Sequence, residues 1–221
     1  MLRRLFTTGA LLLWAAVATS EPVAATYVLR ASSGSEQRSA EFVLVRTDQV
    51  VEVHDKASGI VERWALDPSG PVFYSRIFLG AGKVIEFQPA DFASAGVTDS
   101  WDTIRSVLPL ASLRELTARG HGRTLGVRTD LYRGNLDGTK VSVAWIADLG
   151  LPAQIERKGT AARSRLQLTS LERGSEALAH LVPGSRIDSF EHVDFADLGD
   201  REGDPVIEGL LAQSEFALHA H

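Results

Sequence analysis

The sequence predicts a mainly β fold of the α+β class, in which short helices pack on one face of an antiparallel sheet. Three observations predict it. Short apolar stretches separated by turn residues recur at intervals of about ten residues. Several of them alternate apolar with polar side chains, and the links between them are too short for parallel crossovers. Two helical patterns lie between two groups of such strands, around residues 100–119.

The first group contains six predicted strands. The turn Asp67–Gly70 is the strongest of its links, because Pro68 fixes φ and the glycine accepts positive φ. In the strand before this turn, alternation places Glu62 and Trp64 on one face. One face of the sheet is therefore expected to be packed and the other partly exposed to water. The six strands are expected at residues 26–31, 41–46, 50–54, 60–66, 72–79 and 84–87.

The first helical pattern begins after Asp99 or Ser100, either of which can cap a helix. Its apolar residues have helical spacing, and Pro109 should end or kink the helix because it lacks an N–H donor. These apolar residues are Trp101, Ile104 and Leu108.

The second helical pattern begins with a capping box, in which Ser112 is the N-cap and Glu115 lies at the third helical position. Gly120 is expected to end this helix. The chain should therefore form two short helices at an angle, rather than one long helix.

The β pattern then resumes and continues to residue 171. Residues 125–132 alternate, whereas residues 140–147 are apolar on both faces, which is typical of a central strand covered on both sides. Asp148–Pro152 is expected to turn the chain, and residues 153–157 and 165–171 to form the last two strands of this group.

The C-terminal segment 188–204 is acidic, with seven carboxylates in 17 residues. Asp200, Glu202 and Asp204 alternate as at the start of a calcium loop, but the glycine and the distal glutamate of such a loop are misplaced. Acids near a helix N-terminus explain the segment better. Asp204 and Pro205 fit the N-cap and first position of a final helix around residues 205–215. No metal site is therefore predicted here.

The first 25 residues are predicted to be a signal peptide for export to the periplasm. Arg3 and Arg4 precede a short apolar stretch, and small residues follow at two candidate cleavage sites, Ala16–Ala18 and Val23–Ala25. The apolar stretch is shorter than the roughly 20 residues of a membrane-spanning helix. The arginine pair fits both the general and the twin-arginine export routes. Residues 26–221 are expected to form a single domain, because no repeat or low-complexity linker divides them.

Composition excludes several partners. The net charge of −5 at pH 7 gives no electrostatic reason to bind nucleic acid. The sequence has no cysteine, so it offers neither a lipid-attachment residue after the leader nor a disulfide framework. A chain of this length can stabilise a core without disulfides. We therefore expect a soluble protein without a stable membrane anchor.

No catalytic motif is present. The sequence has neither Gly-x-Ser-x-Gly nor the His-Glu-x-x-His zinc motif, and Gly120–Gly122 lacks the strand and helix of a phosphate loop. Gly34–Glu36 and Gly174–Glu176 lie in polar stretches that are expected to be connections. His192 beside the aspartates of the acidic segment leaves a metal-dependent enzyme as an alternative, although a hydrogen-bonded surface histidine is the simpler interpretation. We expect no enzyme, no cofactor and no metal.

Six aromatic side chains exceed what a sheet packed on one face strictly needs. If the helices cover only part of the concave face, some of these side chains would line an apolar cavity, which is the usual character of a small-ligand site. The candidate ligand-binding residues are Trp64, Phe73, Phe78, Phe87, Trp101 and Trp145.

Residues 141–156, VSVAWIADLGLPAQIE, resemble the strand–turn–strand of the periplasmic outer-membrane lipoprotein carriers and their sensor relatives. The matching positions are Asp148, Gly150, Leu151 and Pro152. The resemblance implies an antiparallel half-barrel plugged by helices, which binds acyl chains or a lipidated partner and has no catalytic residues. The chain departs from the family in two ways. The family begins its mature part with a helix, where residues 26–31 form a predicted strand, and residues 195–205 have no counterpart.

Two functions follow as hypotheses. The first is a soluble periplasmic binding or carrier protein for an apolar ligand, either a lipid or the acyl chains of a lipoprotein. The alternative is an interaction, sensor or assembly module of the cell envelope, whose protein partner docks on a sheet edge or on the acidic segment 188–204.

Overall fold

The structure is a computed structural model that describes residues 21–93, 97 and 100–201. Two antiparallel meanders supply most of its strands, and one further strand follows near the end of the described chain. The first meander consists of β1 (Val23–Ser33), β2 (Glu36–Arg46), β3 (Val50–Asp55), β4 (Ile60–Leu66), β5 (Val72–Phe78) and β6 (Lys83–Phe87). The others are β7 (Thr117–Thr124), β8 (Val127–Leu136), β9 (Thr139–Ile146), β10 (Leu151–Lys158), β11 (Ala162–Arg173) and β12 (Glu191–Asp194).

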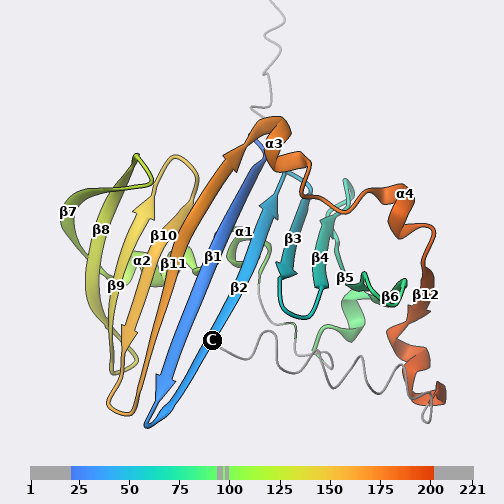
Figure 1. The fold of residues 1–221 in the computed structure, drawn as a ribbon, viewed down its shortest axis with the longest axis horizontal. Helices are drawn as coiled ribbons and strands as arrows, with labels where there is room; N and C mark the ends of the chain where they lie inside the picture. Colours follow the sequence, from blue (N-terminus) through green and yellow to red (C-terminus); the bar gives the residue numbers. More distant parts are fainter. Residues whose placement is uncertain (1–20, 94–96, 98–99, 202–221) are drawn as a thin grey trace, which may run out of the picture.

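These strands form one curved sheet in the order β12-β6-β5-β4-β3-β2-β1-β11-β10-β9-β8-β7 (Figure 1). Neighbouring strands are antiparallel, except that β12 runs parallel to β6. The sheet does not close on itself, because β7 and β12 are its two edges. The mainly β fold with a curved antiparallel sheet, expected from the sequence, is therefore confirmed.

The central strand β1 joins the two meanders, since it pairs with β2 on one side and with β11 on the other. Its first residues, Val23, Ala24 and Ala25, are buried, with at most 3% of their surface exposed. These three residues belong to the predicted signal peptide, whose residues 1–20 lie outside the described part of the chain. The folded part of the chain thus begins before residue 26.

Helical segments are short. They are η1 (Pro89–Asp91), α1 (Trp101–Ser106), α2 (Leu110–Glu115), α3 (Gly174–Leu178), α4 (Gly184–Ile187) and η2 (Phe195–Arg201). The cap of α1 is as predicted, because the Ser100 hydroxyl accepts a hydrogen bond from the Thr103 N–H. The final helix predicted around residues 205–215 lies outside the described residues.

The predicted start and end of the second helix are wrong. The N-cap of α2 is Pro109, and Ser112 lies inside the helix. Pro109 already holds the chain extended in front of Leu110, so the helix starts earlier than the capping-box pattern indicates. The helix ends at Glu115, and Gly120 occupies an irregular position of β7 with φ of 105°. The helical insert therefore spans 101–115 rather than 100–119.

Two strands were not predicted. Residues 117–124 carry almost no apolar side chains, and β7 forms as an exposed edge strand paired with β8. The acidic segment contributes β12, which pairs with β6 through residues 191–194. Neither strand has the alternation on which strand prediction depends. Gly174–Glu176, expected to be a connection, belong to α3 (Gly174–Leu178).

The sheet has two packed faces. We call the face against α1 and α2 the inner face, and its core includes Leu108, Leu113 and Leu116 from the helical insert. We call the opposite face the outer face. Smaller clusters lie there under α3 and the segment that leads to α4, with Ala177 and Val182 as covering residues. Figure 1 looks onto the outer face, with α1 and α2 behind the sheet. No helix in the described chain is long and apolar enough to span a membrane.

Candidate functional site

Three aromatic rings form a continuous row on the inner face of β4, β5 and β6, and we call them the ring row. Trp64 and Tyr74 are paired residues of β4 and β5, with ring centroids 5.0 Å apart. Tyr74 is also paired with Phe87 of β6, at 4.8 Å. Phe195 of η2 covers one end of the row by stacking on Phe87 at 4.7 Å. Strand register therefore builds the row, because directly opposed residues bring their side chains together.

The ring row is covered by residues from segments without long helices. Phe195 belongs to η2, and Phe92, which directly follows η1, meets Tyr74 edge-on at 6.4 Å. Phe92 and Leu198 are partly buried against the same inner-face core. Short 3-10 segments, rather than α1 and α2 alone, thus close this half of the inner face.

A buried charged pair lies beside the ring row. Glu62 is only 3% exposed and pairs across the strands with Arg76, whose Nε lies 3.4 Å from a Glu62 carboxylate oxygen. The same Nε–H donates to the Tyr74 hydroxyl at 2.7 Å. The Arg76 guanidinium also lies 5.8 Å from the ring centroids of Tyr74 and Phe87. The pair is therefore built into the aromatic surface.

Three buried polar atoms of this cluster have no hydrogen bond of good geometry, although the Glu62 carboxylate lies within reach of Tyr74 and Arg76. They are both carboxylate oxygens of Glu62 and the indole Nε1 of Trp64. Burial raises the pKa of Glu62, and the positive charge of Arg76 opposes that rise. Burial also raises the pKa of Tyr74, and the Glu62 charge adds to the effect. Buried polar groups in folded proteins are nearly always paired, so these atoms mark an unusual site.

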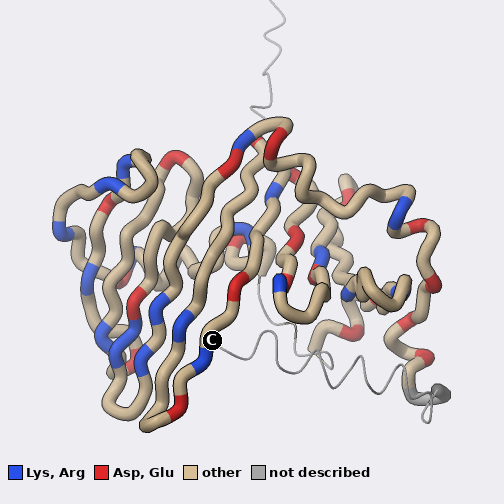
Figure 2. The backbone as a smooth tube through the Cα atoms, viewed as in Figure 1, with Lys and Arg blue, Asp and Glu red and all other residues tan. Residues whose placement is uncertain are grey.

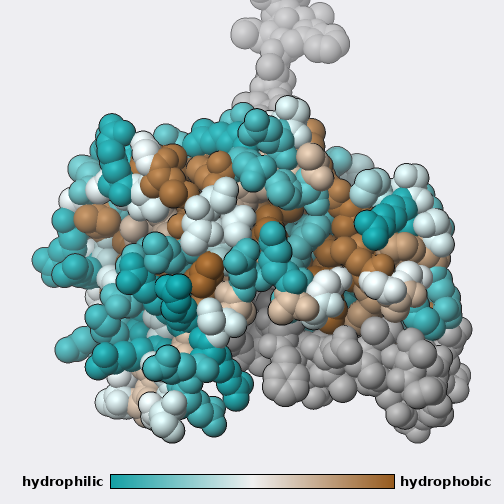
Figure 3. Space-filling model, in the orientation of Figure 1, coloured by the Kyte–Doolittle hydropathy of each residue, from teal (hydrophilic) through white to brown (hydrophobic). Residues whose placement is uncertain are grey.

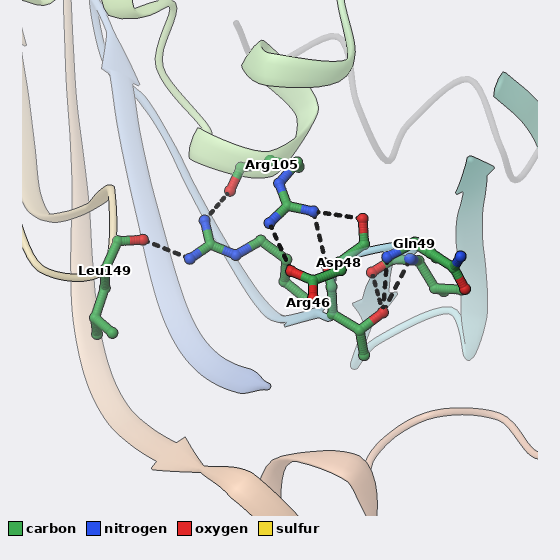
Figure 4. Close-up of polar contacts among 7 residues, drawn as sticks. Arg46, Asp48, Gln49, Arg105 and Leu149 are labelled. Carbon is green, nitrogen blue, oxygen red and sulfur yellow. Dashed lines mark hydrogen bonds and ion pairs between the residues drawn. The ribbon is translucent and has the colours of Figure 1, made fainter. Parts of the chain in front are cut away.

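The buried guanidinium of Arg46 connects α1 to the sheet (Figure 4). Arg46, at the end of β2, is 7% exposed and donates to the main-chain carbonyls of Arg105 and Leu149. Arg105 in turn donates to the carbonyls of Thr47 and Asp48, at 2.7 and 2.9 Å. Burial lowers the pKa of Arg46 to about 10, and the nearby Arg105 charge contributes. Arg46 thus joins β2, the end of α1 and the β9–β10 turn.

The sequence did not identify Arg46 as important. One signal was present, because an arginine that follows an apolar run at the end of a strand can place its long stem over the core and its guanidinium against free carbonyls. The Asp148–Pro152 turn, which carried the family resemblance, supplies one of these carbonyls through Leu149.

Five of the six predicted ligand-binding residues face the inner side of the sheet. Trp64, Phe78, Phe87 and Trp145 are buried in its core. Trp101 is partly buried in α1, with the Arg105 guanidinium 5.5 Å from its ring. Ligand binding by these residues stays a prediction.

Phe73 is the exception. It is 39% exposed, and its neighbours along β5 pair on the inner face, so Phe73 points to the outer side. Including Phe73 with the inner-face residues was therefore wrong. Tyr74, which sequence analysis did not select, occupies the inner position instead.

The inner face is packed around these rings. A surface hollow of about 590 Å³ lies elsewhere, between the β7–β8 turn and the end of β11. It is lined by Leu125, Val127, Thr169, Ser170, Leu171, Glu172, Arg173 and Glu176. A ligand on the ring row would therefore have to displace its covering residues.

Candidate metal ligands do not converge in the described chain, where no group of three or more His, Asp or Glu side chains could hold an ion. His192 bonds through both ring nitrogens, to Glu86 at 2.8 Å and to the Ile187 carbonyl at 3.1 Å. Its hydrogen bond to Glu86 raises the pKa of His192. His192 is thus a hydrogen-bonded histidine near the surface, which was the simpler of the two interpretations.

Comparisons with known proteins give a likeness of fold alone. No family model and no curated protein matches the sequence. Among solved structures, PNGF-II has a TM-score of 0.45 at 12% identity; the match covers 83% of this chain but 32% of that one. An uncharacterized conserved protein from Thermus thermophilus has a TM-score of 0.45 at 11% identity, with coverages of 78% and 90%.

A putative outer membrane lipoprotein-sorting protein domain from Vibrio parahaemolyticus has a TM-score of 0.37 at 8% identity, and the match covers 76% of this chain and 89% of that domain. This chain spans about a third of the length of PNGF-II and most of the length of the other two. The weak resemblance to the lipoprotein-carrier fold, expected from the sequence, is therefore found among solved structures. It carries no argument about function.

Proposed function

We propose that this chain is an exported binding protein that carries an apolar ligand, a lipid or the acyl chains of a lipoprotein, on the inner face of its sheet. The single observation that supports it is the ring row, an extended aromatic surface that stacks under Phe195 and meets Phe92 edge-on. Apolar surfaces that a short segment can uncover are suited to acyl chains, because burial of hydrocarbon is favourable in proportion to its area.

The covering residues can move without breaking the two meanders. Phe195 and Phe92 belong to segments outside the two meanders, so their displacement leaves the β1–β11 ladders intact. Each uncovered ring would contact the ligand instead of the protein. The aromatic surface would therefore stay buried in both states. The covered and the ligand-bound states would then differ little in free energy.

Displacement of a fluorescent fatty-acid probe tests the proposal. The protein purified from its native host should carry lipid in native mass spectrometry, and the delipidated protein should bind the probe. Phe195→Ala should bind it faster, because one covering ring is missing. Phe73→Ala, on the outer face, is the matched control and should bind like the unmodified protein. Absence of both lipid and probe binding would refute the carrier function.

A second candidate function, an interaction module for an acidic partner protein, is favoured by a separate observation. The outer face of five neighbouring strands carries six exposed Lys and Arg side chains. Strand register places them in two adjacent rows, since Arg30 pairs with Arg165, and Lys158 pairs with both Lys140 and Arg163. We call them the basic face, which consists of Arg30, Arg133, Lys140, Lys158, Arg163 and Arg165.

The basic face lies in the lower left of Figure 2 and is hydrophilic in Figure 3. Glu156, which forms a 3.1 Å ion pair with Lys158, is an acid among these rows. Such a cluster attracts an anionic partner and speeds its association at low salt. Site-specific crosslinking from position 163 should capture an acidic envelope protein, and Arg163→Glu with Lys140→Glu should abolish capture. Arg128→Glu, outside the basic face, is the control. Crosslinking to lipid, or capture that charge reversal leaves unchanged, would contradict this role.

A further inference from the structure

We infer that Glu62 and Trp64, held beside Arg76 on the inner face, form an anchor for the uncharged hydroxyl end of an amphiphile whose acyl chain lies on the ring row. This inference rests on the proposed carrier function and adds the chemistry of the ligand's polar end. The observation behind it is that the buried indole N–H of Trp64 has no hydrogen-bond partner, on the same face of β4 as the buried Glu62 carboxylate, whose oxygens make no hydrogen bond of good geometry and whose ion pair with Arg76 is 3.4 Å long.

These atoms match a hydroxyl group. The indole Nε1–H of Trp64 can only donate, and the Glu62 carboxylate can only accept while it is ionised. A hydroxyl both donates and accepts, so one hydroxyl, or two on neighbouring carbons, can satisfy both residues. Glu62 and Trp64 are two residues apart on β4 and therefore project from the same face of the strand.

The charge of the site favours a neutral ligand. Glu62 lies 3.4 Å from Arg76, so the two opposite charges already balance each other. A fatty-acid carboxylate bonded to the Trp64 N–H would also face the Glu62 carboxylate, and a fatty amine bonded to Glu62 would also face the Arg76 guanidinium. Either ion would leave one net charge in a buried place, which is strongly unfavourable. A glycerol-type end adds none.

The apolar chain has a surface next to the anchor. Trp64 contributes its N–H to the anchor and its ring to the ring row, and Tyr74 stacks on that ring at 5.0 Å. Arg76 links the two parts, since it pairs with Glu62 and lies over the rings of Tyr74 and Phe87. Hydroxyl end and acyl chain would thus be bound by one continuous set of side chains on β4, β5 and β6.

Competition against the fluorescent fatty-acid probe tests the anchor in the full mature protein. Three competitors with the same chain are compared, namely 1-monooleoylglycerol, oleate and oleylamine. We expect monooleoylglycerol to displace the probe at a concentration about tenfold lower than either ion, because a site built to bond a hydroxyl discriminates against analogues that leave its groups unpaired.

Two variants separate the anchor from the apolar surface. Trp64→Phe keeps a ring but loses the N–H. It should lower the affinity for monooleoylglycerol about fivefold to tenfold and leave the affinity for oleate unchanged. Phe73→Leu, on the outer face of β5, is the control and should change the binding of neither ligand. Glu62→Gln removes the negative charge that faces the ligand, so oleate should bind more tightly and the preference for the neutral ligand should shrink.

A measurement on the unmodified protein covers the case in which a variant fails to fold. In a nitrogen-15 spectrum, the indole N–H signal of Trp64, which forms no hydrogen bond in the free protein, should move downfield on addition of monooleoylglycerol. Equal displacement by all three competitors, or an unmoved Trp64 signal with ligand bound, would overturn the anchor and leave the carrier function standing. If no competitor and no probe binds, the carrier function itself fails.

Discussion

The carboxylate of Glu52 accepts a hydrogen bond of 3.0 Å from the main-chain N–H of Val182, which lies 130 residues further along the chain. Glu52 is fully buried on the outer face of β3, where it also bonds His54 and forms an ion pair with Arg63. Val182 belongs to the segment between α3 and α4. One satisfied carboxylate therefore fixes that segment to the sheet, whereas Glu62 on the next strand is buried on the inner face with oxygens that make no hydrogen bond of good geometry.

Glu52→Gln should destabilise the fold. The amide keeps the shape of the carboxylate but removes its charge, which leaves the partly buried Arg63 guanidinium without a counter-ion. We expect a loss of about 3 kcal/mol in the free energy of unfolding, measured by urea titration. Glu36→Gln, in an exposed ion pair with Arg38, is the control and should change stability by less than about 0.5 kcal/mol. A loss as small as that of the control would show that Glu52 does not hold the α3–α4 segment.

Arg46→Met should release α1 from the sheet. The apolar stem is retained, but the hydrogen bonds to the Arg105 and Leu149 carbonyls are lost, and both carbonyls lose a donor. We expect a loss of about 2–4 kcal/mol in stability, with the largest increase in amide hydrogen exchange at residues 100–107. Arg38→Met, whose side chain is exposed, should leave both measurements unchanged. Uniform exchange increases over the sheet would contradict a local role for Arg46.

The attachment of β12 should weaken as the pH rises. The hydrogen bond to Glu86 raises the pKa of His192 above 6.5, and the charge of Asp188 acts in the same direction. Stabilisation by a histidine whose pKa is raised in the folded state is complete below pH 6.5, and it is lost as the pH rises through the folded-state pKa. Amide protection factors at residues 191–194 should therefore be larger at about pH 5.5 than at about pH 8.5. His192→Gln should remove this difference, and a difference that persists would assign the effect to another group.

The mature protein should begin before Val23. Cleavage after Ala25 would remove three buried residues from β1, which pair with both β2 and β11. Glu21 and Pro22 also contact the body, since the Glu21 carboxylate lies 3.9 Å from the Arg173 guanidinium and the Pro22 carbonyl accepts from the Gly174 N–H at 2.9 Å. Of the two candidate sites, cleavage after Ala18 keeps these contacts, and N-terminal sequencing of the exported protein should give Thr19.

A stability comparison tests the same boundary independently of the peptidase. A chain that starts at Thr26 should be less stable than one that starts at Thr19 by about 2 kcal/mol or more, because Val23 alone is a fully buried apolar side chain. Equal stability of the two chains would show that residues 23–25 are dispensable for the fold.

Alternation in the sequence placed most of the site's residues on the correct face. Glu62 and Trp64 were predicted to share a face, and both lie on the inner side. The assignment failed at Phe73, which was chosen as an aromatic side chain although alternation places it opposite Tyr74 and Arg76, the inner residues of β5. The pairing of Glu62 with Arg76 depends on the register between two strands, and the register is fixed by packing of the whole face rather than by either strand.

The sequence by itself determined the alternating strands, the Ser100 cap and the turns, because these depend on local steric preferences and on side-chain periodicity. The tertiary structure decided that β1 pairs with β11, that an acidic segment adds a parallel strand beside β6, and that Arg46 reaches carbonyls 59 and 103 residues away. Such contacts join segments with no local signal, and they form only because burial of the complete sheet compensates the entropy of bringing distant parts of the chain together.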